Sequence, residues 1–551
     1  IIITPKPARF PLALSFLEML LRPTLVHSHV SFTSARSYSP SLPCGPCSIS
    51  HSSSFSCSRK AVTYSASKVR HRDGKSTVKW NDIYKKISLI ENAEFGSASV
   101  LDHLELEGQK PSKRALCRTV KELRKFKNYK RALEVFEWMI DHGTTNEFSA
   151  SDAAIQLDLI SKVQGITGAE NYFQTLSNEL KDKRVYGALL NAYARARMKE
   201  KAESLLDEIR SKRHFLSSLI FNVMMTLYMK LKQFDNVESM ISEMMEKGIK
   251  LDVYSYNIWL SSCGLQGSLA RMEQVLGRMR LNRTLNPNWS TFTMMASMYI
   301  RAGESQKATE CLKMAEIRVF GRDHFPYHYL IKLYGRLGEK GEVYRIWNLY
   351  KSSFFNIRNV GYYIMIYSLS WMDDVEGAKE IYDEWLSVMS RYDPRIGDIL
   401  LLGYVKNGDS KQVEDFFNHM VEVGGGKASS RTWEIMAEGH IHGKRVAAAL
   451  SCLKEAGSVV GSKGWVPRLT NVSSFLKLCE EEDNMKNRED LMVLLREKGC
   501  LDMGHYASAL GLCNGSVVAE SDGSSVGIDQ MIHESEDELS LEGGALVNYD
   551  N

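Results

Sequence analysis

The sequence predicts an all-α protein, built as one elongated solenoid of helix-turn-helix repeats of about 35 residues. Three observations predict this fold: an aromatic residue recurs at a nearly constant period, and small residues and glycines recur at two further fixed positions. The aromatic column is Tyr186, Phe221, Tyr256, Phe292, Tyr327 and Tyr362, in steps of 35 or 36 residues, and it continues as Gly397 and Trp433. Such a period is typical of stacked helical hairpins, in which each repeat buries its apolar face against its neighbours.

Each repeat contains two predicted helices, and we number its positions so that the aromatic residue is position four. Positions four, seven, eight and eleven then form an apolar stripe on the first helix. Position fifteen is glycine in several copies, which predicts a left-handed residue at the end of the first helix. These glycines are Gly267, Gly303, Gly338 and Gly408. Position twenty is small or β-branched in nearly every copy, as expected where two helices of a hairpin approach closely.

Positions two, five, nine and thirteen fall on a different face of the first helix, because steps of three and four keep residues in line. In three consecutive copies this face holds Leu219, Asn222 and Lys230, then Tyr254 and Asn257, then Ser290, Thr293 and Arg301. The array therefore repeats an apolar or aromatic group, a small hydrogen-bonding group and often a cation along one surface.

One stretch carries a family resemblance, from Phe221-Asn-Val-Met-Met through Met244 to Lys247-Gly-Ile-Lys-Leu-Asp252. It resembles the pentatricopeptide repeat, which has an aromatic-Asn start, a late Met and a terminal Lys-Gly-x-x-Pro-Asp; Leu251 replaces the usual Pro. The tetratricopeptide repeat has a shorter period and does not fit. The resemblance covers roughly residues 115–496, about ten copies, and implies a right-handed superhelix. Arg431-Thr-Trp-Glu434 and Trp465-Val-Pro467 also resemble the plant organellar branch built of plain repeats, the P-class.

The resemblance implies binding of single-stranded RNA, with one base chosen by the fifth and the last residue of each repeat. Carried over by position, Asn222 with Asp252 implies uridine, Asn257 with Asn288 a pyrimidine, and Thr293 with Asp323 guanosine. Position two, occupied by Leu219, Tyr254 and Ser290, would stack on the bases. Other pairs are irregular, including Tyr363 with Asp393, Asp398 with Ser429, and His328 with Arg358 or Asn359.

Cations recur at position thirteen, near the end of first helices. They are Arg195, Lys230, Arg301, Arg336 and Lys406. They are spaced as expected for one phosphate per repeat. Compensation of the helix dipole predicts the same residues, so both explanations stay open.

The two ends of the chain differ from the array. Residues 1–72 hold nine Lys or Arg and one acid, with many serines, which predicts an organelle transit peptide, and Met19 is a more credible start than Ile1. Serine richness slightly favours the chloroplast over the mitochondrion. We expect capping helices over 73–112, the repeat array over 113–500, and an acidic disordered tail over 501–551.

No pattern of catalytic residues emerges, so we expect a protein that is not an enzyme and uses no cofactor, metal or small-molecule substrate. Cys44-Gly-Pro-Cys47 matches a redox dithiol but lies in the targeting segment without a strand and helix around it. His440-Ile-His442 has no third ligand nearby in the sequence. No apolar run is long enough for a membrane span.

Two function classes remain after these exclusions. The chain is either an adaptor that binds an organellar transcript and assists its stabilisation, processing or translation, or a structural module, such as a ribosome-associated subunit, that reads no bases. The three regular repeats favour the first class, and the irregular pairs and modest charge favour the second.

Overall fold

The structure is a computed structural model that describes residues 78–90, 96–142, 148–212, 216–282, 284–320, 323–389, 392–425, 428–459, 465–502 and 506. Within these ranges the chain forms α-helices and no strand, which confirms the all-α prediction. The expected targeting segment over 1–72, with Cys44-Gly-Pro-Cys47, and nearly all of the expected acidic tail lie outside the described residues.

The helices are α2 (Trp80–Ser88), α3 (Ser97–Leu106), α4 (Lys113–Lys125), α5 (Tyr129–Asp141), α6 (Ala150–Val163), α7 (Gly165–Thr175), α8 (Lys183–Arg195), α9 (Lys199–Ser211), α10 (Ser218–Lys230), α11 (Phe234–Glu246), α12 (Val253–Leu265), α13 (Leu269–Leu281), α14 (Trp289–Arg301), α15 (Ser305–Glu316), α16 (Phe325–Arg336), α17 (Lys340–Ser353), α18 (Asn359–Trp371), α19 (Val375–Val388), α20 (Pro394–Asn407), α21 (Ser410–Val423), α22 (Ser430–His442), α23 (Val446–Ser458), α24 (Leu469–Glu481) and α25 (Met485–Glu497). A short 3₁₀ turn follows at Cys500–Asp502.

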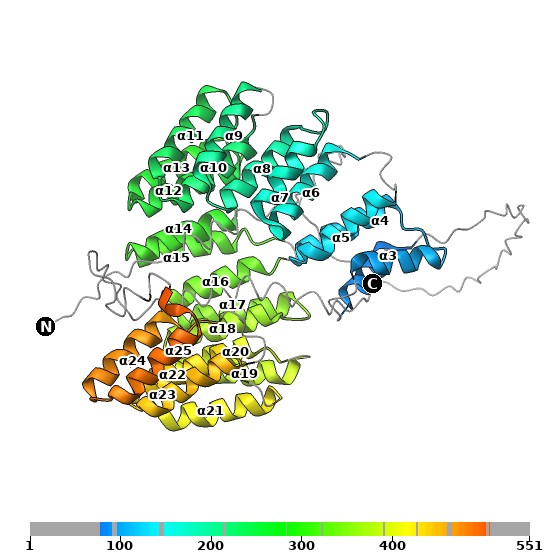
Figure 1. Cartoon of the computed structure of the whole chain (residues 1–551). Helices are drawn as coiled ribbons and strands as arrows, with labels where there is room; N and C mark the ends of the chain where they lie inside the picture. The colour runs from blue at the N-terminus through cyan, green and yellow to red at the C-terminus, as the bar shows by residue number, and fades with distance from the viewer. Residues whose placement is uncertain are drawn as a thin grey trace, which may run out of the picture.

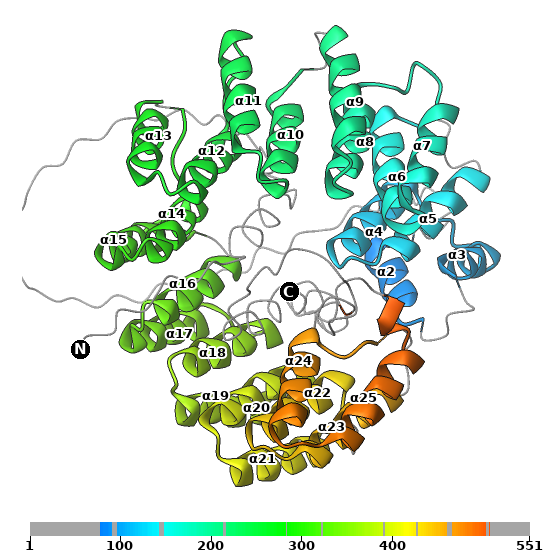
Figure 2. The same ribbon diagram turned by 60° about the vertical axis from the view of Figure 1, so that its left-hand side comes forward.

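The helices stack as hairpins along a coiled path (Figure 1). Each even-numbered helix pairs with the odd-numbered helix that follows it, and from α6 to α24 it also packs against the next even-numbered helix. Figure 2 shows the even-numbered helices on the inner side of the coil and the odd-numbered helices on the outer side. The inner surface is therefore built by the first helix of each repeat, which carries the predicted binding face.

The apolar stripe forms the core of the array. Phe221, Met224, Met225 and Tyr228 are all buried, as predicted for positions four, seven, eight and eleven. The buried residues form three clusters, and α6 and α14 each contribute side chains to two of them. The core is thus extended along the chain, as expected for a solenoid in which each repeat contacts only its neighbours.

Position fifteen is left-handed in the repeats that begin with α4 and with α8 to α24, whether or not it is glycine; in the repeat of α6 it is Gln164, with φ −105°, and the next residue, Gly165, has φ 82°. The predicted glycines have φ between 75° and 79°. Where the position holds another residue in those repeats, the backbone keeps a positive φ, as at Arg197, Lys232 and Asp373. A non-glycine residue there costs roughly 1 kcal/mol, so the turn geometry is imposed by the packing of the two helices.

Position twenty is buried at the contact between paired helices, as predicted. Ala202, Val237, Ala308 and Ala378 are each 0% exposed. Among the described residues, no helix is long and apolar enough to cross a membrane.

Candidate nucleic-acid interface

The structure brings the first predicted base-reading pair together. The Nδ2 amide of Asn222 donates to both carboxylate oxygens of Asp252, at 3.1 and 3.2 Å. Asp252 is also the N-cap of α12, and its Oδ1 accepts a hydrogen bond from the backbone N–H of Ser255 at 2.8 Å. Capping alone accounts for a polar residue at the last position, but the contact with Asn222 shows that the two predicted residues share one site on the inner side.

The second pair is joined through a third residue. The hydroxyl of Thr291 lies 2.8 Å from Oδ1 of Asn257 and 3.1 Å from Oδ1 of Asn288. Asn288 caps α14 as Asp252 caps α12. Asn257, which lies on α12, is only 1% exposed, because the next inner helix, α14, packs closely against it.

The third pair is arranged differently. Thr293 is fully buried, and its hydroxyl donates to the carbonyl oxygen of Ser290 in its own helix at 3.2 Å. Asp323 accepts from the backbone N–H of Phe325 at 3.1 Å, one residue before the N-cap of α16. Pro326 occupies position three of this repeat and has no hydroxyl with which to join the two residues.

A hydrogen-bonding residue at position three was missed by the sequence analysis. It donates to the fifth residue of the preceding repeat in four places. These contacts run from Ser255 to Asn222, from Thr291 to Asn257, from Thr432 to Asp398, and from Asn471 to Glu434. Where the preceding fifth residue is Gly, Thr, His or Tyr, position three is instead Ile220, Pro326, Gly361 or Ile396. A polar residue at position three thus accompanies a polar Asn, Asp or Glu at position five of the preceding repeat, and this correlation in the sequence could have identified the contact.

The predicted stacking residues differ in exposure. Leu219 is 59% exposed and Tyr254 is half-buried, so both present surface on the inner helices. Ser290 is buried, and its hydroxyl oxygen accepts from Nδ2 of Asn257 at 3.3 Å. Phe325 occupies the same column and is 39% exposed, so it offers a ring that the sequence analysis passed over.

The predicted phosphate-binding cations have different surroundings. Arg195 lies 3.5 Å from Asp158 and donates to Ser161 at 2.7 Å, so it bridges neighbouring repeats. Arg336 lies over the ring of Trp371, 5.0 Å from its centre. Lys230 is half-buried and Lys406 is exposed. Arg301 has a buried Nη1 without a hydrogen-bond partner, and burial lowers its pKa, so Arg301 is the clearest site for an anionic ligand among the five.

Asp398 and Glu434 occupy position five of neighbouring repeats near the C-terminal end of the array, and their carboxylates differ in how many hydrogen-bond partners they have. Asp398, at position five of α20, accepts from the hydroxyl of Thr432 at 2.7 Å through Oδ1, while its buried Oδ2 has no hydrogen-bond partner. Burial raises the pKa of Asp398 to about 6, and Asp393 adds to this, against the opposing charges of Arg431 and Arg468.

Glu434, one repeat further, is closed by its neighbours. Its Oε2 accepts from Nε of Arg468 at 2.5 Å, and its Oε1 accepts from the indole N–H of Trp465 at 3.0 Å. Asn471 donates to its backbone carbonyl oxygen at 3.0 Å. Both carboxylate oxygens are occupied, so this repeat offers no free group to a base.

The raised pKa of Asp398 predicts a pH-dependent stability. Between pH 3.8 and about 6 the folded state holds this proton more tightly than the unfolded chain, so the free energy of unfolding falls as pH rises through that window. Asp398→Asn removes the titration, and the variant is expected to gain about 3 kcal/mol over the wild type at pH 7.5. Urea unfolding at pH 4 and pH 7.5 measures the difference; an equal difference at both pH values would contradict the prediction.

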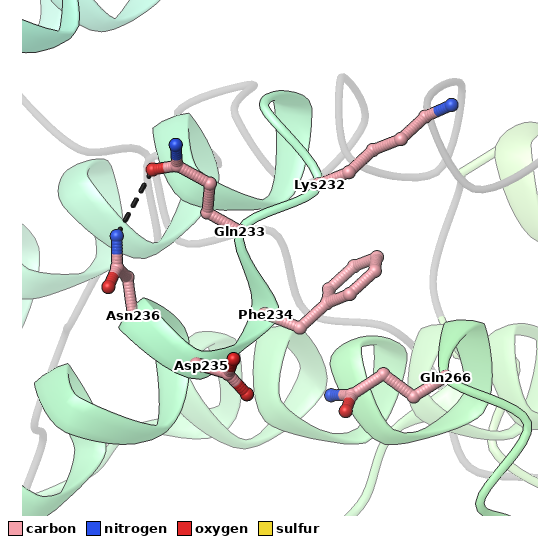
Figure 3. Close-up of a pocket in the computed structure, with 6 residues that line it drawn as sticks. All are labelled: Lys232, Gln233, Phe234, Asp235, Asn236 and Gln266. Atoms are coloured by element: carbon pink, nitrogen blue, oxygen red, sulfur yellow. Dashed lines mark hydrogen bonds between the residues drawn. The ribbon is translucent and has the colours of Figure 1, made fainter.

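A shallow recess lies at the opposite end of α10 from Asn222. It is lined by Lys232, Gln233, Phe234, Asp235, Asn236 and Gln266 (Figure 3). Asn236 donates to Oε1 of Gln233 at 3.1 Å across one side of it. The recess sits at the turn between inner and outer helices and is separate from the column of fifth residues. Within the described part of the chain, no group of three His, Cys, Asp or Glu residues could hold a metal ion.

Comparison with known proteins identifies the family. The PPR repeat family model matches residues 216–264, and the PPR repeat model matches residues 184–214, 254–283 and 398–425. A pentatricopeptide repeat-containing protein of Arabidopsis thaliana is 47% identical over 526 residues, which cover 95% of this chain and 100% of that protein. The chain belongs to the pentatricopeptide repeat family.

Further pentatricopeptide repeat relatives in Arabidopsis thaliana carry names that specify a location. One, named mitochondrial, is 34% identical over 76% of this chain and 85% of its own length. Another, the large ribosomal subunit protein mL101, is 34% identical over 69% of this chain and 77% of its own length. These relatives support an organellar location, and neither name supports the expected preference for the chloroplast.

The chain is also similar to solved pentatricopeptide repeat structures. Maize PPR10 matches with a TM-score of 0.38 and 18% identity, over 66% of this chain and 61% of that one, less than two thirds of its length. At this score the likeness adds nothing to the assignment.

Proposed function

We propose that the protein binds single-stranded RNA along its inner helices, with one nucleotide to each repeat, and acts as an adaptor on an organellar transcript. The observation that carries this proposal is the Asn222 and Asp252 site, where an amide of α10 and the carboxylate that caps α12 meet. Amide and carboxylate groups recognise the exposed edges of unstacked bases. The protein acts by occupying the RNA, through stabilisation, processing or translation of the transcript, and it catalyses no reaction.

Stacking and charge complete the proposed interface. Leu219, Tyr254 and Phe325 supply apolar surface on which bases stack. Arg301 supplies a guanidinium whose buried N–H groups gain a phosphate as acceptor. We place the protein in the mitochondrion, in line with the names of its relatives, and in the plain-repeat subclass.

A ribosome-associated role is the second candidate, and one specific observation favours it: mL101, a large ribosomal subunit protein, is 34% identical to this chain. In that role the inner surface would bind protein or ribosomal RNA without reading bases. Sedimentation of organelle extracts distinguishes the two candidates. Migration with large ribosomal subunits after nuclease treatment favours the ribosomal role, and recovery of one discrete transcript footprint favours the adaptor.

Single substitutions test base reading against phosphate binding. Asn222→Ala is expected to lower affinity by roughly 1 to 3 kcal/mol and to relax preference at one base only, because its amide contacts a base edge. Arg301→Ala is expected to weaken all sequences alike and to reduce the salt dependence of binding. Affinities for selected RNAs at two salt concentrations measure both effects.

The control is Lys307→Ala, which removes one positive charge from the outer helix α15, where Lys307 pairs with Glu273 at 2.8 Å. We expect it to leave base preference and salt dependence unchanged. If Asn222→Ala and Arg301→Ala act alike on every sequence, base reading is wrong.

A further inference from the structure

The hydroxyl at position three fixes the orientation of the fifth residue of the preceding repeat. Ser255 donates to Oδ1 of Asn222 at 2.8 Å, and Thr291 lies at the same distance from Oδ1 of Asn257. In both sites the amide oxygen is occupied, and the Nδ2 group turns toward the other side. The position-three hydroxyl therefore fixes the orientation of the fifth residue: in the asparagine sites the amide oxygen accepts from it, and Nδ2 donates to Asp252 or to Ser290.

Asp398 is held by the same contact. Thr432 donates to Oδ1 of Asp398 at 2.7 Å, and Thr432 is itself fixed by Ser429, whose hydroxyl lies 2.7 Å away and whose oxygen accepts from the backbone N–H of Thr432 at 3.0 Å. Asp398 is 1% exposed, and its Oδ2 has no hydrogen-bond partner. An unpartnered polar atom at such a site costs about 1 to 3 kcal/mol in the free protein, which a ligand with suitable donors would recover.

We propose that Asp398 is a further base-reading residue and that its repeat selects guanosine. The proposal rests on the proposed function, since it assumes that RNA lies along the inner helices. An ionised carboxylate only accepts hydrogen bonds, so the polarity of this site is opposite to that of the asparagine sites. Its base must therefore present donors.

Guanine fits this site better than the other bases. Its Watson–Crick edge carries two adjacent donors, N1–H and N2–H₂, which the two oxygens of a carboxylate can accept together. Its O6 is an acceptor. Arg431 lies close enough to Asp398 to lower the pKa of that carboxyl, and the buried Nε of Arg431 has no hydrogen-bond partner. Uracil has one N–H between two carbonyl oxygens, which a carboxylate repels, and adenine and cytosine each offer a single amino donor beside an acceptor.

The next repeat also has an acid at position five, but its carboxylate is not available to a base. This acid is Glu434, and Arg468 and Trp465 occupy its oxygens. We expect no base preference at the nucleotide that faces it. The reading surface therefore ends at Asp398.

The experiment selects RNA from a random pool with the full-length chain and then measures affinity for RNAs that differ at one nucleotide. Five repeats separate Asn222 in α10 from Asp398 in α20. We expect guanosine to be preferred at least tenfold over adenosine five nucleotides from the position that responds to Asn222→Ala. Asp398→Asn presents an amide N–H in place of an acceptor, so it should reduce this preference below threefold and shift it toward a pyrimidine.

Two further variants separate recognition from folding. Thr432→Val removes the hydroxyl that orients Asp398, and it should reduce the guanosine preference while changing affinity for the whole pool less than threefold. Lys411→Ala, on the exposed face of the outer helix of the same repeat, is the matched control and should change nothing.

The outcomes distinguish this inference from the proposed function. A wild-type preference at the Asn222 nucleotide, with none for guanosine five nucleotides away, would overturn the role of Asp398 and leave RNA reading intact. An equal loss at every nucleotide in Asp398→Asn would show a folding effect and would also overturn it. Absence of RNA binding in the wild type would overturn both.

Discussion

Arg468→Ala is expected to lower the free energy of unfolding by about 3 to 5 kcal/mol at pH 7.5, because it leaves a buried carboxylate without its partner. Glu434 is only 2% exposed, and it loses both the Nε contact at 2.5 Å and the charge that opposes its raised pKa. A buried acid without a partner takes up a proton. The loss should therefore be smaller at pH 5 than at pH 7.5.

The matched control is Arg445→Ala. Arg445 and Glu414 also form an Arg–Glu pair between neighbouring repeats, at 2.6 Å, but their side chains are 38% and 47% exposed. An exposed pair contributes about 0 to 1 kcal/mol, so this variant should unfold almost like the wild type. Urea unfolding at both pH values, with hydrogen exchange of α22 to α24 to locate the change, measures the contrast. Equal losses in the two variants would show that burial of the Glu434 pair contributes nothing.

The periodicity of the sequence predicted the fold because every repeat buries the same apolar positions against its neighbours. The left-handed residue at position fifteen could be predicted from Gly267 and Gly303, and the structure extends it to positions such as Lys232, whose side chain gives no such hint. The packed pair of helices requires this turn whatever residue occupies it. The residue types at position fifteen therefore indicated the left-handed turn in fewer repeats than the structure shows; Gln164 is the exception, and there Gly165 takes the left-handed conformation.

The candidate site was only partly accessible to sequence reasoning. Asn222 and Asp252 meet as the resemblance implied, since both lie at fixed positions of one repeat boundary. Sequence did not reveal that Asn257 and Thr293 would be buried, because their exposure depends on how closely successive inner helices approach. In the structure α14 covers Asn257, whose side chain therefore presents almost no surface on the inner side of the coil.

The contacts of Glu434 could not be predicted for a related reason. They join residues 31 to 37 positions apart, at the boundary between two repeats. One sequence shows which residue types recur in a column, but it does not show which neighbouring columns pair. Glu434 and Asp398 occupy the same column but differ in their contacts: Arg468 donates a hydrogen bond to Glu434, whereas Asp398 accepts one from the hydroxyl of Thr432.

Trp347→Ala is expected to lower the free energy of unfolding by about 3 to 5 kcal/mol, because it opens a cavity in the largest core cluster. Trp347 is 1% exposed, and its ring lies edge-on to Tyr362, 5.2 Å between centres, across the boundary between two repeats. The loss should uncouple α16 and α17 from the repeats that follow, which would appear as a second unfolding transition.

Trp347→Phe tests whether a smaller aromatic ring is enough to fill this site. Among the described residues, the indole N–H of Trp347 has no hydrogen-bond acceptor, so phenylalanine removes an unsatisfied donor while it keeps an aromatic ring. We expect it to cost less than about 1.5 kcal/mol. Phe355→Ala, at a fully exposed side chain in the same repeat, should have no measurable effect. A loss in Trp347→Phe as large as that in Trp347→Ala would mean that a smaller aromatic ring does not fill this site and that the full indole is needed to hold the two repeats together.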